Sequence, residues 1–271
     1  MGVNKTLSIS VLSGKGGVGK TNLALNLGWG LHESGHPVML MDCDLGLANI
    51  DVLLGLTPEY TLQDIVYKDL DPAAVLVPIA HERFGFLPAA TGISELTEMS
   101  GDTLKTLFKK LLPFLESYNF LFLDLGAGIH NTVLSLAAMT HMRIVVVTPE
   151  PTAITDGYAL MKVCNARYGI TDYHILVNQA ESEQELKQTF QRLSGACAKF
   201  LGFAPQLLGG VRYDAALIDA VRKQRPFLKN TPHSPGAKDI RGLSAKLDKT
   251  RDSLADYIAL EALFLDRSEK E

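Results

Sequence analysis

One short stretch of the chain decides its fold, and it reads Gly14-Lys15-Gly16-Gly17-Val18-Gly19-Lys20-Thr21. It fits the pattern G-x-x-x-x-G-K-[ST], which indicates a phosphate-binding loop when a strand precedes it and a helix follows it. Residues 7–12 before it form an apolar run, and residues 21–32 after it carry apolar side chains at helical spacing. Both conditions are met, so the sequence predicts a nucleotide-binding P-loop.

The residues of this loop have complementary tasks in holding a nucleotide. Glycines let backbone N–H groups converge on phosphate oxygens, and the helix N-terminus adds the positive end of its dipole. Lys20 is placed to reach the β- and γ-phosphates, and the Thr21 hydroxyl to bind Mg²⁺. We therefore predict that ATP or ADP is bound by Gly14, Gly16, Gly17, Val18, Gly19, Lys20, Thr21 and Asn22.

Short apolar runs alternate with helical patterns along the chain. The runs typical of buried strands are residues 7–12, 38–41, 83–87, 120–123, 143–147 and 174–177. Apolar residues at helical spacing occupy residues 21–32, 103–115, 131–139, 154–167 and 184–199. This alternation predicts a doubly wound α/β fold, in which helices cover both faces of a mostly parallel sheet.

The composition restricts the classes of function. The chain has 271 residues, 46% of them hydrophobic, which is enough for a full-sized core. With 26 basic and 30 acidic residues the net charge is −4, which gives no strong signal for nucleic-acid binding. Cys43, Cys164 and Cys197 form no C-x-x-C pair, so neither a disulfide framework nor a cysteine metal site is indicated. The first apolar run is too short for a signal peptide or a membrane span, so we expect a cytoplasmic protein.

The chain shows no linker or repeat that would divide it, and we expect one P-loop ATPase domain over residues 1–251. Residues 252–271 form a predicted amphipathic tail with an apolar stripe of Leu254, Tyr257, Ile258 and Leu265, but its polar positions are largely acidic. Helices at membrane surfaces favour Lys and Arg instead. Packing of the tail against the protein's own body is therefore favoured over contact with the inner face of the membrane.

Three aspartates follow predicted strands, at the edge where doubly wound sheets bind their ligands. Asp42 and Asp44 end the second predicted strand, and two acids there suit Mg²⁺ and water handling. Asp124 follows the run 120–123, which is the Walker B arrangement in which a carboxylate holds Mg²⁺ directly or through its water. Turn formation or helix capping is the alternative for each of them. We predict a metal site of Thr21, Asp42 and Asp124.

The loop also resembles that of a known family. Residues 15–21, followed by residues 26–27, are similar to the deviant Walker A signature of the MinD/ParA family of ATPases. In that family the early lysine crosses a dimer interface to the partner's nucleotide, so the resemblance implies this role for Lys15 and an ATP-bound homodimer. It also implies that Asp44 orients the attacking water and that Asp42 supports the Mg²⁺ shell or the interface. The predicted catalytic residues are therefore Lys15, Lys20 and Asp44.

Two further positions resemble the family's adenine site. Asn178 closes the run 174–177 and resembles the asparagine that reads adenine, with a plain turn asparagine as the alternative. Asp214 resembles an acidic position in the following adenine loop, although Arg212 stands where relatives usually have proline. Relatives also often carry proline in the turn that reads Leu125-Gly126-Ala127-Gly128 here. We expect this glycine turn to sense the γ-phosphate.

Three further runs of residues indicate which branch of the family this chain resembles. The most diagnostic of them reads Glu150-Pro151-Thr152-Ala153-Ile154-Thr155-Asp156. The others are residues 44–56 and residues 213–214 with 220–225. All three resemble flagellar-number regulators of the FleN/FlhG type, whereas the cell-division and plasmid-partition branches usually lack the first. The resemblance implies a protein partner, which is a flagellar transcription activator or a flagellar assembly GTPase.

The sequence thus predicts an ATPase that alternates between a monomer and an ATP-bound homodimer, with slow hydrolysis resetting the switch. By resemblance, it controls flagellar number or placement through its partner. One alternative is a positioning ATPase of the cell-division or partition kind, which membrane or DNA binding by the ATP form would favour. Another is an ATP-dependent ligase or amidase-type synthase, because similar loops serve such enzymes. A metal-cluster carrier is disfavoured by the lack of paired cysteines.

Overall fold

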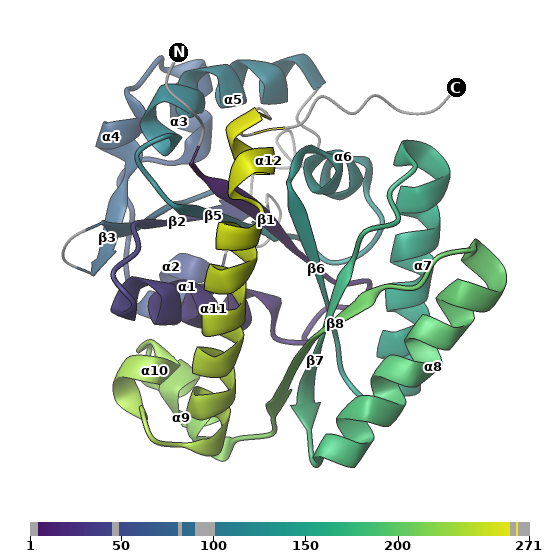
Figure 1. The fold of residues 1–271 in the computed structure, drawn as a ribbon. Helices are drawn as coiled ribbons and strands as arrows, with labels where there is room; N and C mark the ends of the chain where they lie inside the picture. The colour runs from purple at the N-terminus through teal and green to yellow at the C-terminus, as the bar shows by residue number, and fades with distance from the viewer. Residues whose placement is uncertain (1–4, 45–48, 81–82, 90–100, 261–263, 265–271) are drawn as a thin grey trace.

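The computed structural model describes residues 5–44, 49–80, 83–89, 101–260 and 264 (Figure 1). In this part of the chain, eight strands form one sheet in the order β3-β4-β2-β5-β1-β6-β7-β8. They are β1 (Leu7–Leu12), β2 (Val38–Cys43), β3 (Val77–Ala80), β4 (Phe84–Leu87), β5 (Phe120–Leu125), β6 (Met142–Val147), β7 (His174–Ala180) and β8 (Gln206–Arg212). Neighbouring strands are parallel except for β3 and β4. The predicted doubly wound α/β fold is confirmed.

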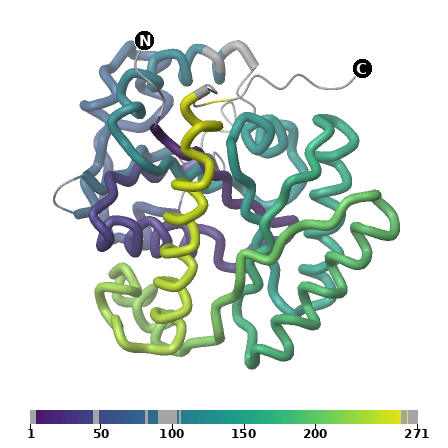
Figure 2. The backbone as a smooth tube through the Cα atoms, viewed as in Figure 1, coloured from purple at the N-terminus to yellow at the C-terminus, as the bar shows by residue number. Residues whose placement is uncertain are grey.

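Helices cover both faces of this sheet (Figures 1 and 2). On one face α1 and α11 lie side by side, with α2, α9 and α10 near them, and the other face is covered by α3 to α8. The bounds are α1 (Lys20–Glu33), α2 (Ile50–Leu54), α3 (Leu62–Tyr67), α4 (Pro72–Val75), α5 (Gly101–Leu115), α6 (Asn131–Met139), α7 (Pro151–Tyr168), α8 (Glu183–Leu201), α9 (Ala215–Arg222), α10 (Phe227–Asn230), α11 (Pro235–Ser253) and α12 (Ala255–Leu260).

The place of β5 within the sheet explains why its sequence is apolar except for Asp124. All six of its residues are buried. Phe120 and Phe122 belong to the core beneath α1 and α11, whereas Leu121 and Leu123 belong to the core beneath α5 to α8. Side chains alternate between the two faces of a strand, so a strand covered on both faces is a continuous apolar run.

The structure adds two strands to the predicted set, and both lie at edges of the sheet. β8 contains Gly209 and Gly210, and only Leu208 and Val211 along it are buried, so its sequence has no continuous apolar run. β3 has four residues, contains Pro78 and pairs antiparallel with β4. Edge strands are half covered, and their weaker patterns escape a search for buried runs.

The order of the strands places the P-loop at the middle of the sheet. β1 lies between β5 and β6, and the chain passes from β1 to β2 on one side and from β5 to β6 on the other. Ligands of such sheets bind at the carboxyl ends of the strands, where the direction of winding changes. The segments that follow β1, β2 and β5 therefore meet at one edge.

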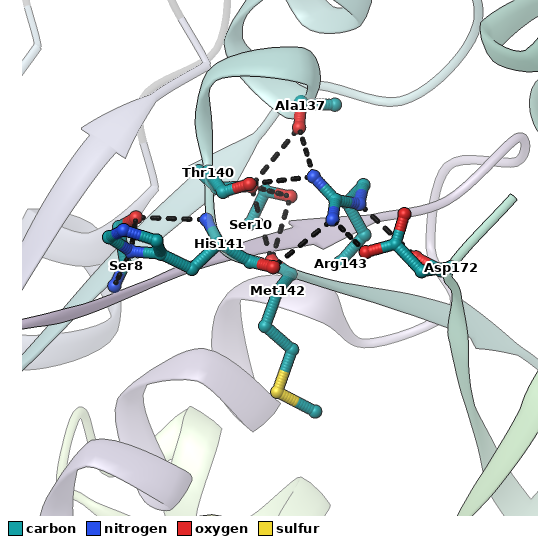
Figure 3. A network of polar contacts seen from close by, with 8 residues as sticks. All are labelled: Ser8, Ser10, Ala137, Thr140, His141, Met142, Arg143 and Asp172. Atoms are coloured by element: carbon teal, nitrogen blue, oxygen red, sulfur yellow. Dashed lines mark hydrogen bonds and ion pairs between the residues drawn. The ribbon is translucent and has the colours of Figure 1, made fainter. Parts of the chain in front are cut away.

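A buried guanidinium stabilises the amino end of β6 (Figure 3). The Arg143 side chain is wholly buried and donates hydrogen bonds to the carbonyl oxygens of Ala137 (3.3 Å), Thr140 (2.6 Å) and His141 (3.1 Å). It also donates to the Asp172 carbonyl (3.2 Å) and pairs with the Asp172 carboxylate. These bonds satisfy carbonyls at the end of α6 that have no helical partner. A buried arginine is tolerated because its donors and its charge are both matched.

The described part of the C-terminal tail packs on the protein. Ile258 is buried and Leu254 is partly buried against the core, while Tyr257 is half-exposed and meets the ring of His141. Phe264 packs on Phe108 of α5 with ring centroids 4.1 Å apart. The expected start of the tail at residue 252 falls within α11, so the division into domain and tail stays a prediction. Leu265 lies outside the described residues, among which no helix is long and apolar enough to span a bilayer.

Candidate nucleotide-binding site

A cavity of about 1000 Å³ opens at the carboxyl ends of β1, β2 and β5. The P-loop and α1 contribute Gly16, Gly17, Gly19, Lys20, Thr21 and Asn22 to its wall. The segment from β2 to α2 contributes Cys43, Asp44, Asn49, Val52 and Leu53, and the segment after β5 contributes Gly126, Ala127, Ile129, His130, Asn131, Thr132 and Val133. The volume falls in the range of ligand-binding pockets. Six of the eight predicted phosphate-binding residues line this cavity, whereas Gly14 and Val18 do not, and phosphate binding by the eight stays a prediction.

At two positions of the loop only glycine fits, because a Cβ atom would collide with neighbouring residues. Gly19 has φ 94°, and a Cβ there would lie 2.5 Å from Nδ2 of Asn178. A Cβ on Gly14 would lie 2.1 Å from the carbonyl oxygen of Asp156. The first turn of α1 holds no acidic residue and no side-chain cap, so its N–H groups remain for an anion. The loop therefore has the shape and polarity of a phosphate cradle.

Lys20 is the buried cation of the cavity. Its side chain lies among the carboxylates of Asp124 and Asp44, and only 8% of the residue is exposed. Burial lowers the pKa of its ammonium group, and the two carboxylates counteract this by favouring the charged form. A lysine held in this way is positioned before any phosphate arrives.

Asp124 fits a divalent cation. Its carboxylate is buried and hydrogen-bonded to the side chain of Thr21, and within the described residues its Oδ1 atom has no hydrogen-bond partner. An unsatisfied buried oxygen is costly unless something binds it. Mg²⁺ usually takes one or two protein ligands and completes its shell with water and phosphate oxygens. Thr21 and Asp124 are therefore the pair that would hold Mg²⁺, which would neutralise phosphate charge.

Asp44 lies against the glycine turn after β5. A Cβ on Gly126 would be 3.3 Å from its Oδ1 atom, so the carboxylate and the turn approach each other across the cavity. The N–H group of Gly128 donates to the carbonyl of Ser13 at 2.9 Å, which ties the same turn to the beginning of the P-loop. The structure brings Asp44 to the cavity, and its role in water positioning stays a prediction.

Asp42 lies beside Asp124 and behind the wall of the cavity. The two residues are direct neighbours in the register of β2 and β5, and both are 1% exposed. Both Asp42 carboxylate oxygens accept hydrogen bonds from the backbone of the segment that leads into α2. Its predicted place in the metal site therefore stays a prediction.

Lys15 makes its contacts outside the cavity lining of its own chain. The described cavity wall does not include it, and its ammonium group pairs with the Glu150 carboxylate and donates to the Thr152 hydroxyl at 3.1 Å. Glu150 precedes α7, so the contact joins the P-loop to a segment 135 residues further along the chain.

The structure does not bring the two predicted adenine residues to the cavity wall. The Asn178 side chain donates to the carbonyl of Val18 at 2.8 Å and so supports the P-loop from behind. The Asp214 carboxylate caps α9 at the N–H of Ala216 (3.0 Å) and accepts from the N–H of Gly236 (3.0 Å). Arg212, in the place of proline, makes an ion pair with Asp239. Adenine contacts by Asn178 and Asp214 stay predictions.

Several residues of the cavity are not identified by the sequence analysis. Val52 and Ile129 are large apolar side chains at its rim, and they are 58% and 49% exposed. In a short helix or a loop, the sequence pattern does not distinguish an exposed apolar residue from a buried one. The exposure of Val52 and Ile129 could therefore not be predicted. Asn49 and His130 also line the cavity. His130 could have been predicted to line the cavity, because it follows closely on the glycine turn that was expected to sense the γ-phosphate.

The two buried carboxyl groups predict a pH-dependent stability of the nucleotide-free protein. Burial raises the pKa of Asp42 to about 8, with the Asp124 charge adding to the shift, and burial raises the pKa of Asp124 to about 6. The fold favours their neutral forms, so their contribution to stability is complete at low pH. It is lost as the pH rises through about 6 for Asp124 and about 8 for Asp42.

Asp124→Asn removes one of these charges and should make the nucleotide-free protein more stable than wild type at pH 8, with little difference at pH 4. A gain of about 1 kcal/mol or more is expected, because one pKa unit corresponds to about 1.4 kcal/mol. Thermal melting at a series of pH values measures it. Asp252→Asn, which changes an exposed carboxylate, is the control. Parallel pH profiles for wild type and Asp124→Asn would contradict the prediction.

Comparison with known proteins identifies the family. A family model described as ParA: NUBPL iron-transfer P-loop NTPase matches residues 4–248. The chain therefore belongs to the MinD/ParA family of P-loop NTPases, whose ATPases bind nucleotide and Mg²⁺. The words 'iron-transfer' are part of the description of the family model and are not a property assigned to this chain. Within the residues that the structure describes, all three cysteines are buried and free, and no group of three His, Cys, Asp or Glu side chains is placed to hold a metal ion.

Individual relatives agree with the predicted branch. The antiactivator FleN of Pseudomonas aeruginosa is 38% identical over 240 residues, which cover 89% of this chain and 85% of FleN. The flagellum site-determining protein YlxH of Helicobacter pylori is 27% identical and covers 95% of this chain and 87% of its own. The solved structure of MinD from Pyrococcus horikoshii, complexed with Mg-ADP, has a TM-score of 0.73 and 25% identity and covers 90% of this chain and 97% of its own. The predicted resemblance is confirmed.

Proposed function

We propose that this protein is an ATP-dependent dimerising switch that controls flagellar number or placement through a protein partner, and that slow ATP hydrolysis resets it. Its similarity to FleN and YlxH over most of the chain supports the flagellar role. The phosphate cradle, the buried Lys20 and the pair of Thr21 and Asp124 support ATP and Mg²⁺ as its ligands. The buried, free cysteines are compatible with a reducing cytoplasm as its location.

The observation that carries this proposal is the position of Lys15. Lys15 belongs to the phosphate-binding loop, but it does not line the cavity of its own chain and contacts Glu150 and Thr152 instead. Its side chain is 38% exposed, so an approaching subunit has access to it. We infer that Lys15 acts on the nucleotide of a second copy of the chain.

The rim of the cavity supports a face that becomes buried in the dimer. Val52 and Ile129 expose apolar side chains next to a polar, phosphate-binding floor. Full burial of such a side chain contributes roughly 1.5–3 kcal/mol, so covering the exposed half of each contributes about 1 kcal/mol, which a monomer does not gain. A second subunit seated on this rim would bury both residues and close the cavity to water.

The proposed partner surface lies next to the same rim. The Gln224 side chain, which follows α9, donates to the carbonyl of Val52 in α2 at 2.9 Å. Leu56 and Ile218 expose apolar side chains nearby on the same two segments. A surface that joins these segments would change with the occupancy of the cavity. We propose that a flagellar transcription activator or assembly GTPase binds there when ATP closes the dimer.

Asp44→Ala is expected to bind ATP and to lose hydrolysis, because its predicted task is to position water and not to bind phosphate or base. The variant should therefore accumulate as a dimer with ATP and Mg²⁺. Size exclusion with light scattering measures the dimer, and phosphate release measures hydrolysis. A monomer under these conditions, or hydrolysis at the wild-type rate, would show that Asp44 has another role.

The same variant tests the branch of the family. Used as bait in native lysate with ATP, it should retain a flagellar transcription activator or assembly GTPase, whereas Lys20→Ala should not. Recruitment to lipid vesicles or DNA by the ATP form would support a positioning ATPase instead. Turnover that requires a small-molecule substrate would support a ligase or synthase.

A further inference from the structure

Both carboxylate oxygens of Asp42 accept hydrogen bonds from backbone groups. Its Oδ1 atom accepts from the N–H of Asp44 at 3.1 Å. Its Oδ2 atom accepts from the N–H of Asn49 at 3.1 Å and from that of Ile50 at 3.4 Å. One side chain thus holds both sides of the segment between β2 and α2, and it lies behind the cavity with only 1% of the residue exposed.

These bonds take the place of a missing helix cap. Asn49 occupies the N-cap position of α2, yet its own side chain makes no capping hydrogen bond. The first N–H groups of a helix have no partner within the helix and need one from outside. Asp42 supplies it from β2, so the beginning of α2 is fixed to the sheet.

The helix held in this way connects the nucleotide cavity with the surface near α9. Val52 and Leu53 of α2 line the cavity, and the Val52 carbonyl accepts from Gln224. Gln224 has φ 52°, which a residue other than glycine adopts only where its surroundings hold it. A shift of α2 would therefore change both the wall of the cavity and the contact with Gln224.

The neighbouring Asp124 is engaged differently. Its Oδ1 atom has no hydrogen-bond partner among the described residues, whereas both oxygens of Asp42 have backbone donors. A cation could bind Asp124 without breaking a bond. Binding Asp42 directly would compete with the N–H groups that hold Asp44 and α2.

We propose that Asp42 is a positioning residue, which fixes Asp44 and the beginning of α2 through backbone hydrogen bonds and is not a direct ligand of Mg²⁺. The inference rests on the proposed function for the task of Asp44, whereas the hydrogen bonds of Asp42 are observed directly in the structure. The two adjacent carboxylates thus have different roles. Asp124 would bind the cation, and Asp42 positions Asp44 and the beginning of α2.

Asp42→Asn tests the proposal with almost no change in volume. An amide has one oxygen, so whichever way it is turned it presents an N–H₂ group to either Asp44 or the pair of Asn49 and Ile50. In the nucleotide-free variant, the amides of Asn49 and Ile50 should exchange with solvent about tenfold faster or more, which corresponds to about 1.4 kcal/mol. In Asp124→Asn, the matched control, they should exchange no faster than in wild type. Unchanged exchange in Asp42→Asn would overturn the proposal, provided that the amides of β7 show the variant to be folded.

The Mg²⁺ dependence of ADP affinity gives the second readout. Asp42→Asn should keep the Mg²⁺ concentration of half-maximal effect within about threefold of wild type, whereas Asp124→Asn should raise it about tenfold or more. An equal rise in both variants would overturn the division of roles. If no variant and no wild type bound ADP, the proposed function would fail, and the exchange result would still decide the role of Asp42.

Wild-type protein provides a measurement that does not depend on the folding of a variant. Adding ADP and Mg²⁺ should leave the amides of Asn49 and Ile50 at least as protected as in the free protein, because Asp42 keeps its backbone partners. Faster exchange of these two amides on adding ADP and Mg²⁺, with no change on adding ADP alone, would mean that Asp42 leaves α2 for the cation. That result would overturn the proposal.

Discussion

Lys20→Ala protein is expected to melt at the same temperature with and without ATP and Mg²⁺. Lys20 is the buried cation of the cavity, and the remaining phosphate contacts come largely from neutral backbone dipoles. Wild-type protein with ligand about a hundredfold above its dissociation constant should gain about 2.7 kcal/mol of stability. The variant should lose this whole gain, and differential scanning fluorimetry compares the two directly.

Lys15→Ala is the matched control, because it removes a lysine from the same loop that does not line the cavity. Its monomer should keep the ATP-induced rise in melting temperature. Direct titration with a fluorescent ATP analogue separates lost binding from lost stabilisation. If the rise in Lys20→Ala were as large as in wild type, the assignment of the phosphate site would be wrong.

The phosphate half of the site could be predicted because it is local in sequence. The loop, the strand before it and the helix after it are contiguous, so a single pattern fixes their geometry. Asp44 and Asp124 could be predicted to approach it because both end buried parallel strands, whose carboxyl ends share one edge. The structure agrees, with Asp44 on the cavity wall and Asp124 bonded to Thr21.

The remaining features depend on contacts between distant segments. Nothing near Asn178 in the sequence indicates that its amide turns to the carbonyl of Val18, which lies 160 positions away. Asp42 could be recognised as a strand-end acid, but its bonds to Asn49 and Ile50 depend on how the chain returns after the intervening segment. β8 could not be predicted for another reason. Its two glycines interrupt the run of apolar side chains by which a buried strand is recognised.

Lys15→Ala should retain the ATP affinity of the monomer and lose ATP-dependent dimerisation and hydrolysis together. In the monomer the side chain is held by Glu150 and Thr152, which it must leave in order to reach a second subunit. A charge-assisted contact in a closed, poorly solvated site is worth roughly 1.5–3 kcal/mol, so dimerisation should weaken about tenfold or more. Sedimentation with ATP and Mg²⁺ measures this loss. A lysine that is only a solvated loop residue would leave affinity, dimerisation and hydrolysis near wild type.

Mixing Lys15→Ala with Asp44→Ala protein separates action across the interface from action within one subunit. In a mixed dimer, one nucleotide has an intact Asp44 from its own subunit and an intact Lys15 from the other, whereas the second nucleotide has neither. Hydrolysis should therefore return to at most about half of the wild-type rate per dimer, although each variant alone is inactive. Differently tagged subunits, purified together with ATP, establish that mixed dimers form. If such dimers hydrolyse no ATP, Lys15 acts within its own subunit, and the two-subunit mechanism does not apply to this protein.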